Sequence, residues 1–407
     1  MTPQPGIEIE RITGDLDPGT RSCWGFMHAP LVRHRDTLYA AMLEAGRINE
    51  GPGAVPWQKQ DGVFRVYRKT GNGPWTETFR GGSQQTVCLL MSPDGALRIV
   101  GGLGPEAWMA AGPGQADRFS LERLGNLGGH PYQGAGIGPE GNACVSWCED
   151  RTKERIGFYD AATGKWTVRD VAEVPQHTGY PYVVVRGRSV DIFKHEAVIL
   201  EGKYCYRILY HLHAKDGLNG AWKMEVLDDA SPGHCECHSA FVDREGRIHV
   251  AYRRNPREYE DGFWDPSDPG HRFFHLIGPP GGPFERSEIE AARGFHRVRL
   301  CQTPDGLYHL FLERADETTK PDPGYRDAIK QSAWNNRTFY CRSADGRAFS
   351  DPRPVEFLPD GIDRLFLLEP SRFGGNWRDG VIEGYTTGGY PGSYMNVYYL
   401  KIDPAKL

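Results

Sequence analysis

A hairpin pattern that recurs along the chain constrains the fold more than any other feature of the sequence. The clearest copy is HCECHSAFVDREGRIHVAYRR (234–254), in which an apolar run, a polar turn with Gly246 and an alternating run follow one another. Two β runs joined by a short turn that contains glycine predict an antiparallel hairpin. The other copies, which bring the number to seven, lie at 28–43, 84–102, 130–147, 180–193, 296–314 and 365–385.

A second pattern lies between these hairpins and consists of a strand, a glycine-rich turn and then an aromatic residue. Its copies lie at 64–79, 156–168, 217–227, 278–289 and 339–352, and their aromatic residues are Trp75, Trp166, Trp222, Phe284 and Phe349. We expect this to be the outer hairpin of each unit, with the aromatic ring filling the space between neighbouring units. Four strands that repeat every ~40–50 residues are typical of a propeller blade.

The two ends of the chain complement each other. The chain begins with an alternating strand at 6–12, which has no hairpin before it, and ends with a third-strand pattern at 394–402. Pairing these two strands would complete the last blade and remove an exposed sheet edge. We therefore expect one all-β domain over 1–407, a seven-bladed β-propeller of four-stranded blades whose last blade is closed by the N-terminal strand.

Composition excludes several classes of function. The net charge of −5 offers no basic field for nucleic acid, and no apolar run approaches the ~20 residues of a membrane span. A signal peptide has a basic segment followed by an apolar core, and the N-terminus shows neither. The odd count of 9 cysteines, most of them in expected strands, favours buried reduced thiols. We expect a cytoplasmic protein, with a periplasmic or secreted location as the alternative if a leader was removed.

Three connections, 45–61, 254–270 and 314–336, are too long for simple turns, and each joins the second strand of a blade to the third. They carry aromatic residues among charged ones: Trp57, Tyr259, Phe263, Trp264, Tyr325 and Trp334. Long loops on a rigid scaffold commonly carry function, and flat rings suit stacking on sugars. The alternative is that these rings only pack the loops down.

Histidine is the commonest residue type where the innermost strands are expected to begin, at the central mouth. The residues placed there are His28, Gln84, Gln85, His130, Tyr180, Tyr182, His234, His238, His296 and Glu369. Several imidazoles that converge on one axis suit proton transfer near neutral pH, although any single one could be structural. Arg253, Arg254 and Arg299 are expected near the same rim, where a guanidinium recognises a carboxylate or pairs with an acidic loop residue.

Metal binding by the first strand of hairpin 234–254 is less favoured. The spacing of His234, Cys235, Cys237 and His238 does not match a CxxC knuckle, and alternation sends neighbouring side chains to opposite faces. We expect no required cofactor, with a structural metal ion as the alternative. A second pair, His211 and His213, lies on one face of a strand and could contribute a ligand to a metal ion.

The chain resembles the BNR-type seven-bladed propellers of the polysaccharide lyases that act on ulvan and on rhamnosyl-glucuronate linkages, with which a rhamnosidase family shares its fold. The shared residues are His234, Gly246 and the strand Ile248-His249-Val250. Arg254 stands where those families carry a second histidine, so which group is the base, and lyase against hydrolase, stays open. Ser343 to Phe349 resembles a shortened Asp-box, the turn motif of sialidase-type propellers.

The resemblance implies a polysaccharide lyase that cleaves a uronic-acid-containing glycan by β-elimination. Arg254 would neutralise the uronate, with His234 and His238 as acid and base and with His130 and Tyr182 in reserve. The residues expected to bind substrate are His28, Gln85, Arg253, His296, Arg299, Trp57, Trp264, Tyr325, Trp334 and Glu369.

Two alternatives to a lyase remain. A glycoside hydrolase, rhamnosidase- or sialidase-like, would normally need two carboxylates, and Glu369 is the one that we place at the mouth. A sugar-binding propeller would need no chemistry at all. In each case the expected partner is an oligo- or polysaccharide, without nucleic acid or membrane, and the oligomeric state is open.

Overall fold

In the residues that it describes, the computed structural model consists mainly of β-strands and the turns between them, with three short helical turns. The residues that it describes are 4–13, 27–44, 62–83, 86–101, 106–110, 118–125, 133–149, 152–174, 178–196, 198–200, 203–205, 207–255, 270–315, 336–359, 361–388 and 396–407. Within them, no helix has the length and apolar character that crossing a membrane requires.

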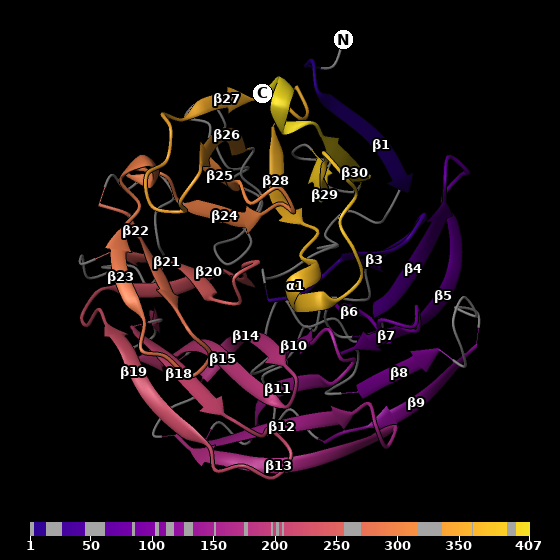
Figure 1. The fold of residues 1–407 in the computed structure, drawn as a ribbon, viewed down its shortest axis with the longest axis vertical. Helices are drawn as coiled ribbons and strands as arrows, with labels where there is room; N and C mark the ends of the chain where they lie inside the picture. The colour runs from indigo at the N-terminus through magenta and orange to yellow at the C-terminus, as the bar shows by residue number, and fades with distance from the viewer. Residues whose placement is uncertain are drawn as a thin grey trace.

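Seven four-stranded antiparallel blades form a ring, which confirms the expected propeller (Figure 1). Blade one consists of β2 (Leu31–His34), β3 (Thr37–Glu44), β4 (Gly62–Thr70) and β5 (Thr76–Ser83). Blade two consists of β6 (Cys88–Met91), β7 (Leu97–Val100), β8 (Glu106–Ala110) and β9 (Phe119–Arg123). Blade three consists of β10 (Gly134–Ile137), β11 (Ala143–Glu149), β12 (Lys153–Asp160) and β13 (Lys165–Glu173).

The remaining blades follow the same order. Blades four and five are β14 (Thr178–Arg186), β15 (Ser189–Glu196), β18 (Ile208–Ala214) and β19 (Lys223–Asp229), and β20 (His234–Val242), β21 (Ile248–Asn255), β22 (Arg272–Gly278) and β23 (Glu285–Glu288). Blade six is β24 (Arg297–Gln302), β25 (Tyr308–Ala315), β26 (Asn336–Ser343) and β27 (Arg353–Val355). A small hairpin, β16 (Val198–Leu200) with β17 (Lys203–Cys205), is inserted in blade four.

Blade seven is closed by the N-terminus, as expected. It consists of β28 (Ile362–Leu367), β29 (Ile382–Gly388), β30 (Asn396–Ile402) and β1 (Ile7–Thr13). β1 pairs antiparallel with β30, with Ile7 opposite Ile402. A single bridge between Asn336 and Ile362 also links blades six and seven. The outermost strand of the last blade therefore comes from the opposite end of the chain and covers the edge of β30.

Apolar packing between blades holds the ring together. The innermost strands β6 and β10 are buried at every position because neighbouring blades cover both faces, whereas the outer strand β9 is largely exposed. The aromatic rings of the outer hairpins contact the neighbouring blade, as predicted. Trp75 of blade one meets the Tyr399 ring of blade seven, and Phe284 of blade five meets Phe193 of blade four. Glycine lets blades three and four approach closely, since a Cβ on Gly136 would overlap the carbonyl oxygen of Val183.

A short helix, α1 (Pro370–Phe373), lies at the centre of the ring (Figure 1). It follows β28 and packs against the innermost strands β2, β6, β10, β14 and β20. The Arg372 guanidinium donates to the carbonyls of Met27 and Ala240 and lies 3.3 Å from Glu369. The innermost strand of blade seven therefore ends in a segment that packs into the middle of the ring.

The long connections join the strands that we expected, namely β3 to β4, β21 to β22, and β25 to β26. Most of their residues, including Trp57, Trp264, Tyr325 and Trp334, lie outside the described residues. The cysteines whose side chains are described agree with buried thiols, because all are buried and free: Cys88, Cys144, Cys148, Cys235, Cys237, Cys301 and Cys341.

Candidate active site

The hairpin of β20 and β21 brings four polar side chains together near the start of an innermost strand. Alternation along β20 places His234, Glu236 and His238 on one face of the strand. In the antiparallel register, Glu236 is opposite Arg253 and His234 is opposite Asn255. We call His234, Glu236, His238 and Arg253 the channel cluster.

One carboxylate oxygen joins the four members of the channel cluster. Arg253 Nη2 lies 2.5 Å from Glu236 Oε2, and the Nε2 atoms of His234 and His238 each lie 3.3 Å from it. Arg253 Nη2 also lies 2.8 Å from His234 Nε2. Because a guanidinium only donates, His234 Nε2 must accept this bond, which places the imidazole proton on Nδ1.

The other histidine has the opposite tautomer. His238 Nδ1 accepts the backbone N–H of Val298 at 3.4 Å, so its proton lies on Nε2, which is 3.3 Å from Glu236 Oε2. The cluster therefore pairs an imidazole that accepts at Nε2 with one that donates there. Donor and acceptor forms of one residue type on a single strand face are what acid–base chemistry needs.

Burial keeps both imidazoles neutral near pH 7. It lowers the pKa of His234 to about 4, assisted by Arg253, and that of His238 to about 3. Burial would raise the pKa of Glu236, but Arg253 and His238 outweigh it and hold that pKa well below its usual range. The Glu236 side chain is 23% exposed, whereas that of Arg253 is fully buried, so the carboxylate is the accessible member of the cluster.

Two further predicted residues border the channel cluster. Arg253 Nη1 donates to the His296 carbonyl at 3.1 Å, and burial holds the pKa of His296 well below its usual range. Arg299 donates to the carbonyls of His238, Val298 and Leu365 and links blades five, six and seven. Burial lowers the pKa of Arg299 to about 9, which leaves it cationic near neutral pH.

Arg254 does not join the cluster, which corrects the expectation that both arginines share one rim with the histidines. It is opposite Cys235 in the register, so its side chain lies on the other face of β21. There its Nε is 3.3 Å from Asp228 Oδ2, a carboxylate that also binds Tyr252 and Arg286. The cation beside the histidines is therefore Arg253.

Glu369 is also displaced from its expected place. It comes after β28 rather than before it, and therefore lies at the opposite end of the innermost strand from His234 in its own blade. It is buried next to α1, and its partner there is Arg372. Burial raises its pKa, against the opposing effect of Arg372 and Arg299.

His28 and Tyr182 are both engaged in contacts that join blades. His28 Nε2 lies 2.9 Å from the Gln133 carbonyl oxygen, and Thr86 Oγ1 lies 3.2 Å from its Nδ1. The Tyr182 hydroxyl donates to the Cys237 carbonyl at 2.8 Å, and the Arg372 guanidinium lies 5.0 Å from its ring. Burial raises the pKa of Tyr182 well above its usual range, which disfavours it as a base. Two other predictions, His130 and Gln85, lie outside the described residues.

Sequence reasoning missed Glu236. The signal that could have found it is the alternation His234, Glu236, His238, which predicts one carboxylate between two imidazoles on a strand face. The same alternation turns Cys235 and Cys237 to the opposite face, where both pack in an apolar cluster. Burial raises the pKa of both thiols, so they are inert neighbours of the site.

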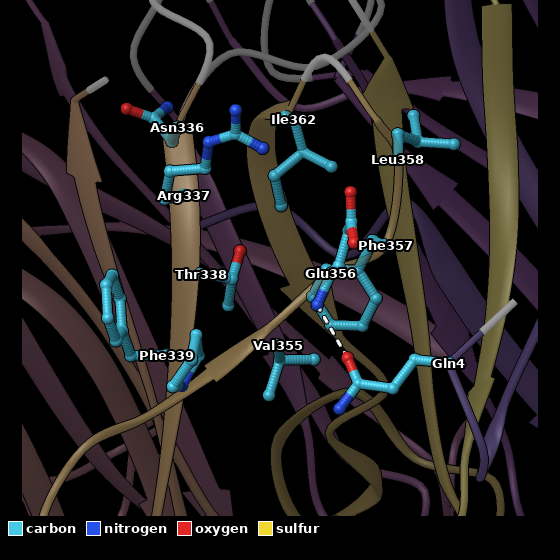
Figure 2. Close-up of a pocket in the computed structure, with 12 residues that line it drawn as sticks. Gln4, Asn336, Arg337, Thr338, Phe339, Val355, Glu356, Phe357, Leu358 and Ile362 are labelled. Atoms are coloured by element: carbon cyan, nitrogen blue, oxygen red, sulfur yellow. Dashed lines mark hydrogen bonds between the residues drawn. The ribbon is translucent and has the colours of Figure 1, made fainter. Parts of the chain in front are cut away.

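The cavities lined by described residues lie away from the channel cluster. One of about 390 Å³ lies between Gln4 of the N-terminal segment and strands β26 and β27, where Thr338 and Phe357 line it (Figure 2). Another of about 560 Å³ lies between blades one and seven, beside Trp377. Neither is lined by a histidine, so neither brings together the residue types that the sequence predicts for the site.

The fold is similar to that of several solved proteins. An ulvan lyase of a polysaccharide lyase family, bound to GlcA(1-4)Rha3S, superposes with a TM-score of 0.60 at 11% identity, over 96% of this chain and 95% of that one. The polysaccharide lyase Uly1 superposes with a TM-score of 0.56 at 10% identity, over 95% and 93%. A lignostilbene dioxygenase from Pseudomonas brassicacearum gives 0.52 at 12% identity, over 98% and 88%.

At such identities the likeness is one of fold. No protein-family model matches the chain, and no curated protein matches its sequence. Propellers with different chemistries share this architecture, so function has to be argued from the site.

Proposed function

We propose that this protein is a polysaccharide lyase that cleaves a uronic-acid-containing glycan by β-elimination at the channel cluster. The observation that carries the proposal is the pair of neutral imidazoles, His234 and His238, with opposite tautomers around one Glu236 oxygen. The ulvan lyases among the similar folds support the same substrate class.

The chemistry of a uronate explains why such a site is needed. The proton on C5 is α to a carboxylate and becomes acidic only when positive charge or hydrogen-bond donors stabilise the developing enolate. In the proposed reaction a neutral imidazole removes that proton, and a donor protonates the leaving O4 oxygen. His234 is the proposed base, because its Nε2 carries a lone pair that becomes available when substrate displaces the Arg253 hydrogen bond, and His238 is the proposed donor.

Arg253 replaces Arg254 as the proposed source of positive charge. Its guanidinium is buried beneath Glu236 and beside His234, so it acts as a positioning residue that sets the His234 tautomer and offsets the Glu236 charge. Arg299 and His296 border the same cluster and are proposed to favour an anionic sugar. The aromatic residues Trp57, Trp264, Tyr325 and Trp334 stay proposed sugar-stacking residues.

Glu236 favours glycoside hydrolysis as the second candidate. It is an ionised and accessible carboxylate, as a glycosidase nucleophile or base must be. A hydrolase would also need a protonated carboxylic acid ~5–10 Å away. Glu369 has a raised pKa, but it lies beside α1 with Arg372. We therefore rank hydrolysis below elimination.

A panel of uronate-containing and neutral glycans separates these functions. The unsaturated uronate made by elimination absorbs in the near ultraviolet, so a rise in absorbance together with new reducing ends selects a lyase. New reducing ends without absorbance would select a hydrolase, and binding without either product would leave a sugar-binding propeller. Glu236→Gln keeps the shape of the side chain and removes its charge, and its loss of activity would place the reaction at the channel cluster.

A further inference from the structure

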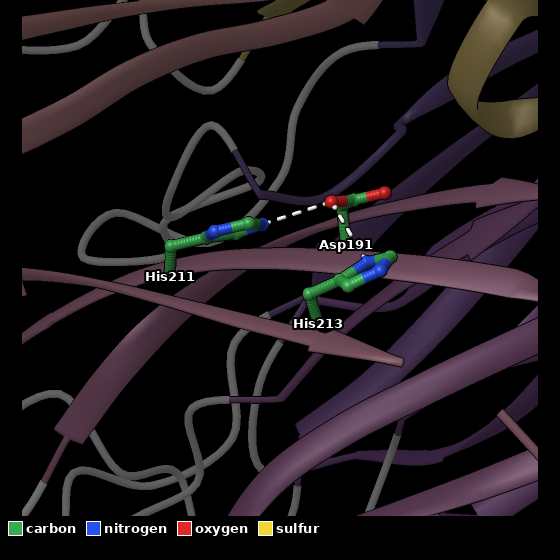
Figure 3. Close-up of side chains that lie close together, drawn as sticks. All are labelled: Asp191, His211 and His213. Atoms are coloured by element: carbon green, nitrogen blue, oxygen red, sulfur yellow. Dashed lines mark hydrogen bonds and ion pairs between the residues drawn. The ribbon is translucent and has the colours of Figure 1, made fainter. Parts of the chain in front are cut away.

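Three potential metal ligands converge in blade four, away from the channel cluster. Asp191 projects from β15, and His211 and His213 project from the neighbouring β18 (Figure 3). One nitrogen of each imidazole and one carboxylate oxygen lie within 4.8 Å of one another. His211 Nε2 is 2.8 Å and His213 Nδ1 is 3.2 Å from the same oxygen, Asp191 Oδ1.

The surroundings hold these ligands in place. Glu225 Oε1 lies 2.9 Å from His211 Nδ1, which leaves Nε2 of that ring directed at Asp191. The backbone N–H of Gly281, from the turn between β22 and β23 of blade five, donates to Asp191 Oδ1 at 2.8 Å. Gly281 has a φ of +78°, and a Cβ there would lie 2.6 Å from His213 Nε2. Only glycine lets this turn approach so closely.

One buried oxygen of the group is unsatisfied. Asp191 Oδ2 makes no hydrogen bond to any residue within the described ranges, although the side chain is only 1% exposed. A buried carboxylate oxygen without a partner is costly and calls for an explanation such as a bound ion. Both imidazoles lie beside the other oxygen, Oδ1, and Oδ2 points away from them (Figure 3).

Blade five carries a comparable network with a different pattern of bonds. There His249 Nε2 lies 2.8 Å from Asp243 Oδ2, and His249 Nδ1 lies 3.0 Å from His275 Nε2. The Nδ1 atom of His275 in turn lies 3.0 Å from the carbonyl oxygen of Gly346. Arg247 also binds both Asp243 oxygens, through its backbone N–H and its Nε. In blade five the hydrogen bonds pass from one side chain to the next, whereas in blade four both imidazoles contact the same carboxylate oxygen. A propeller blade therefore does not in general need two imidazoles on one carboxylate oxygen.

We propose that Asp191, His211 and His213 bind a structural zinc ion. Two imidazole nitrogens and one carboxylate oxygen form a donor set that zinc accepts at ~2.0–2.2 Å, and small side-chain shifts would admit the ion. Glu225 would orient His211 from outside the ligand sphere. A water molecule would complete the coordination. Since Gly281 binds the same carboxylate, the ion would also join blade four to blade five.

Metal content of the full-length protein, prepared without a histidine tag, tests the proposal. We expect a stoichiometric amount of zinc after equilibration with zinc and desalting, and a large loss in Asp191→Asn and His213→Gln. His275→Gln, in the blade-five network, is the matched control and should keep the zinc. Wild type that takes up no zinc, variants that hold as much as wild type, or uptake of calcium in place of zinc would each overturn the assignment.

Cobalt supplies a readout of coordination that does not depend on activity. Co²⁺ in a site of this kind gives visible absorption bands whose intensity reports low coordination number. We expect these bands in wild type and in His275→Gln, and their loss in Asp191→Asn. Zinc should also raise the melting temperature of wild type but not that of Asp191→Asn, because only a ligand that binds the native state stabilises it. Equal shifts in both proteins would contradict the site.

Discussion

Arg253 and Arg254 are adjacent in sequence, yet their guanidinium groups lie on opposite faces of β21 and bind different carboxylates. Arg253 pairs with Glu236 of the same hairpin, and Arg254 lies beside Asp228 of blade four. The first contact belongs to the channel cluster and the second to the junction between two blades. Neighbouring arginines thus offer a matched pair of probes, since each substitution removes the same chemical group.

Replacing each arginine in turn should show that Arg253 contributes to catalysis and that Arg254 contributes only to the structure. Arg253→Gln is expected to lower kcat/KM on the uronate substrate by about 10²-fold or more, because it removes the charge that offsets Glu236 and sets the His234 tautomer. Arg254→Gln should keep near-normal kcat/KM. Both are measured by steady-state kinetics. Equal losses in the two variants would disprove the assignment.

A stability control accompanies that experiment. Arg253→Gln leaves Glu236 without its cation, which could lower stability by itself. The double variant Arg253→Gln/Glu236→Gln removes both charges and should recover most of the melting temperature without recovering activity. Recovery of activity in the double variant would show that neither charge takes part in the reaction.

The pH profile of activity should extend unusually far into acid for a histidine base. A base must be neutral, and burial lowers the pKa of His234 to about 4, so protonation begins only well below the ordinary value of 6.5. We expect kcat/KM to stay level between neutral pH and about pH 5 and then to fall. A midpoint near 6.5 would indicate that another, solvent-exposed histidine is the base.

Stability should nevertheless fall in acid, through buried histidines such as His28. Its pKa is about 4 in the folded protein against 6.5 as the unperturbed value, mainly because of burial. Below 6.5 the unfolded chain binds a proton that the folded chain does not, so stability is present above 6.5 and is lost as pH falls towards 4. Urea unfolding of wild type and His28→Gln at several pH values measures the effect. An unchanged pH slope in His28→Gln would contradict it.

Removing residues 1–13 should lower the melting temperature strongly. β1 is the outermost strand of blade seven, and its loss would expose the edge of β30 and remove the buried Ile7 side chain from its apolar cluster with Leu400 and Ile402. The matched control is Glu8→Gln, which removes only a surface ion pair with Lys401. If the truncated protein melts like wild type, β1 has no closing role.

Arg372→Leu should destabilise the folded protein, because it removes the contacts that hold α1 at the centre of the ring. The Arg372 side chain is fully buried, and its removal leaves Glu369 without its partner and two carbonyls without a donor. Breaking a buried pair in this way costs about 3–5 kcal/mol in the free energy of unfolding. Arg378→Leu, at an exposed position, should cost far less. Denaturant unfolding compares the two, and similar costs would contradict a structural role for α1.

The architecture could be predicted because its determinants are local. Each hairpin is encoded by alternation around a turn residue, as in β20 and β21 around Gly246, whose φ of +84° suits glycine. Closure by β1 was also predictable, since the sequence has one unpaired strand pattern at each end of the chain and these two strands can pair with each other. These features depend on side-chain type and spacing within about ten residues, which a sequence displays directly.

The site required the tertiary structure, because it depends on faces and on contacts between distant segments. Alternation puts Arg253 and Arg254 on opposite faces of β21, and only their contacts with Glu236 and Asp228 show which face meets the histidines. Glu369 was misplaced because α1 interrupts the β28–β29 hairpin. Asp191 meets His213 only because β15 pairs with β18 across the inserted hairpin of β16 and β17. The sequence by itself thus determined seven blades and their closure, whereas only the folded ring decided which side chains share a face.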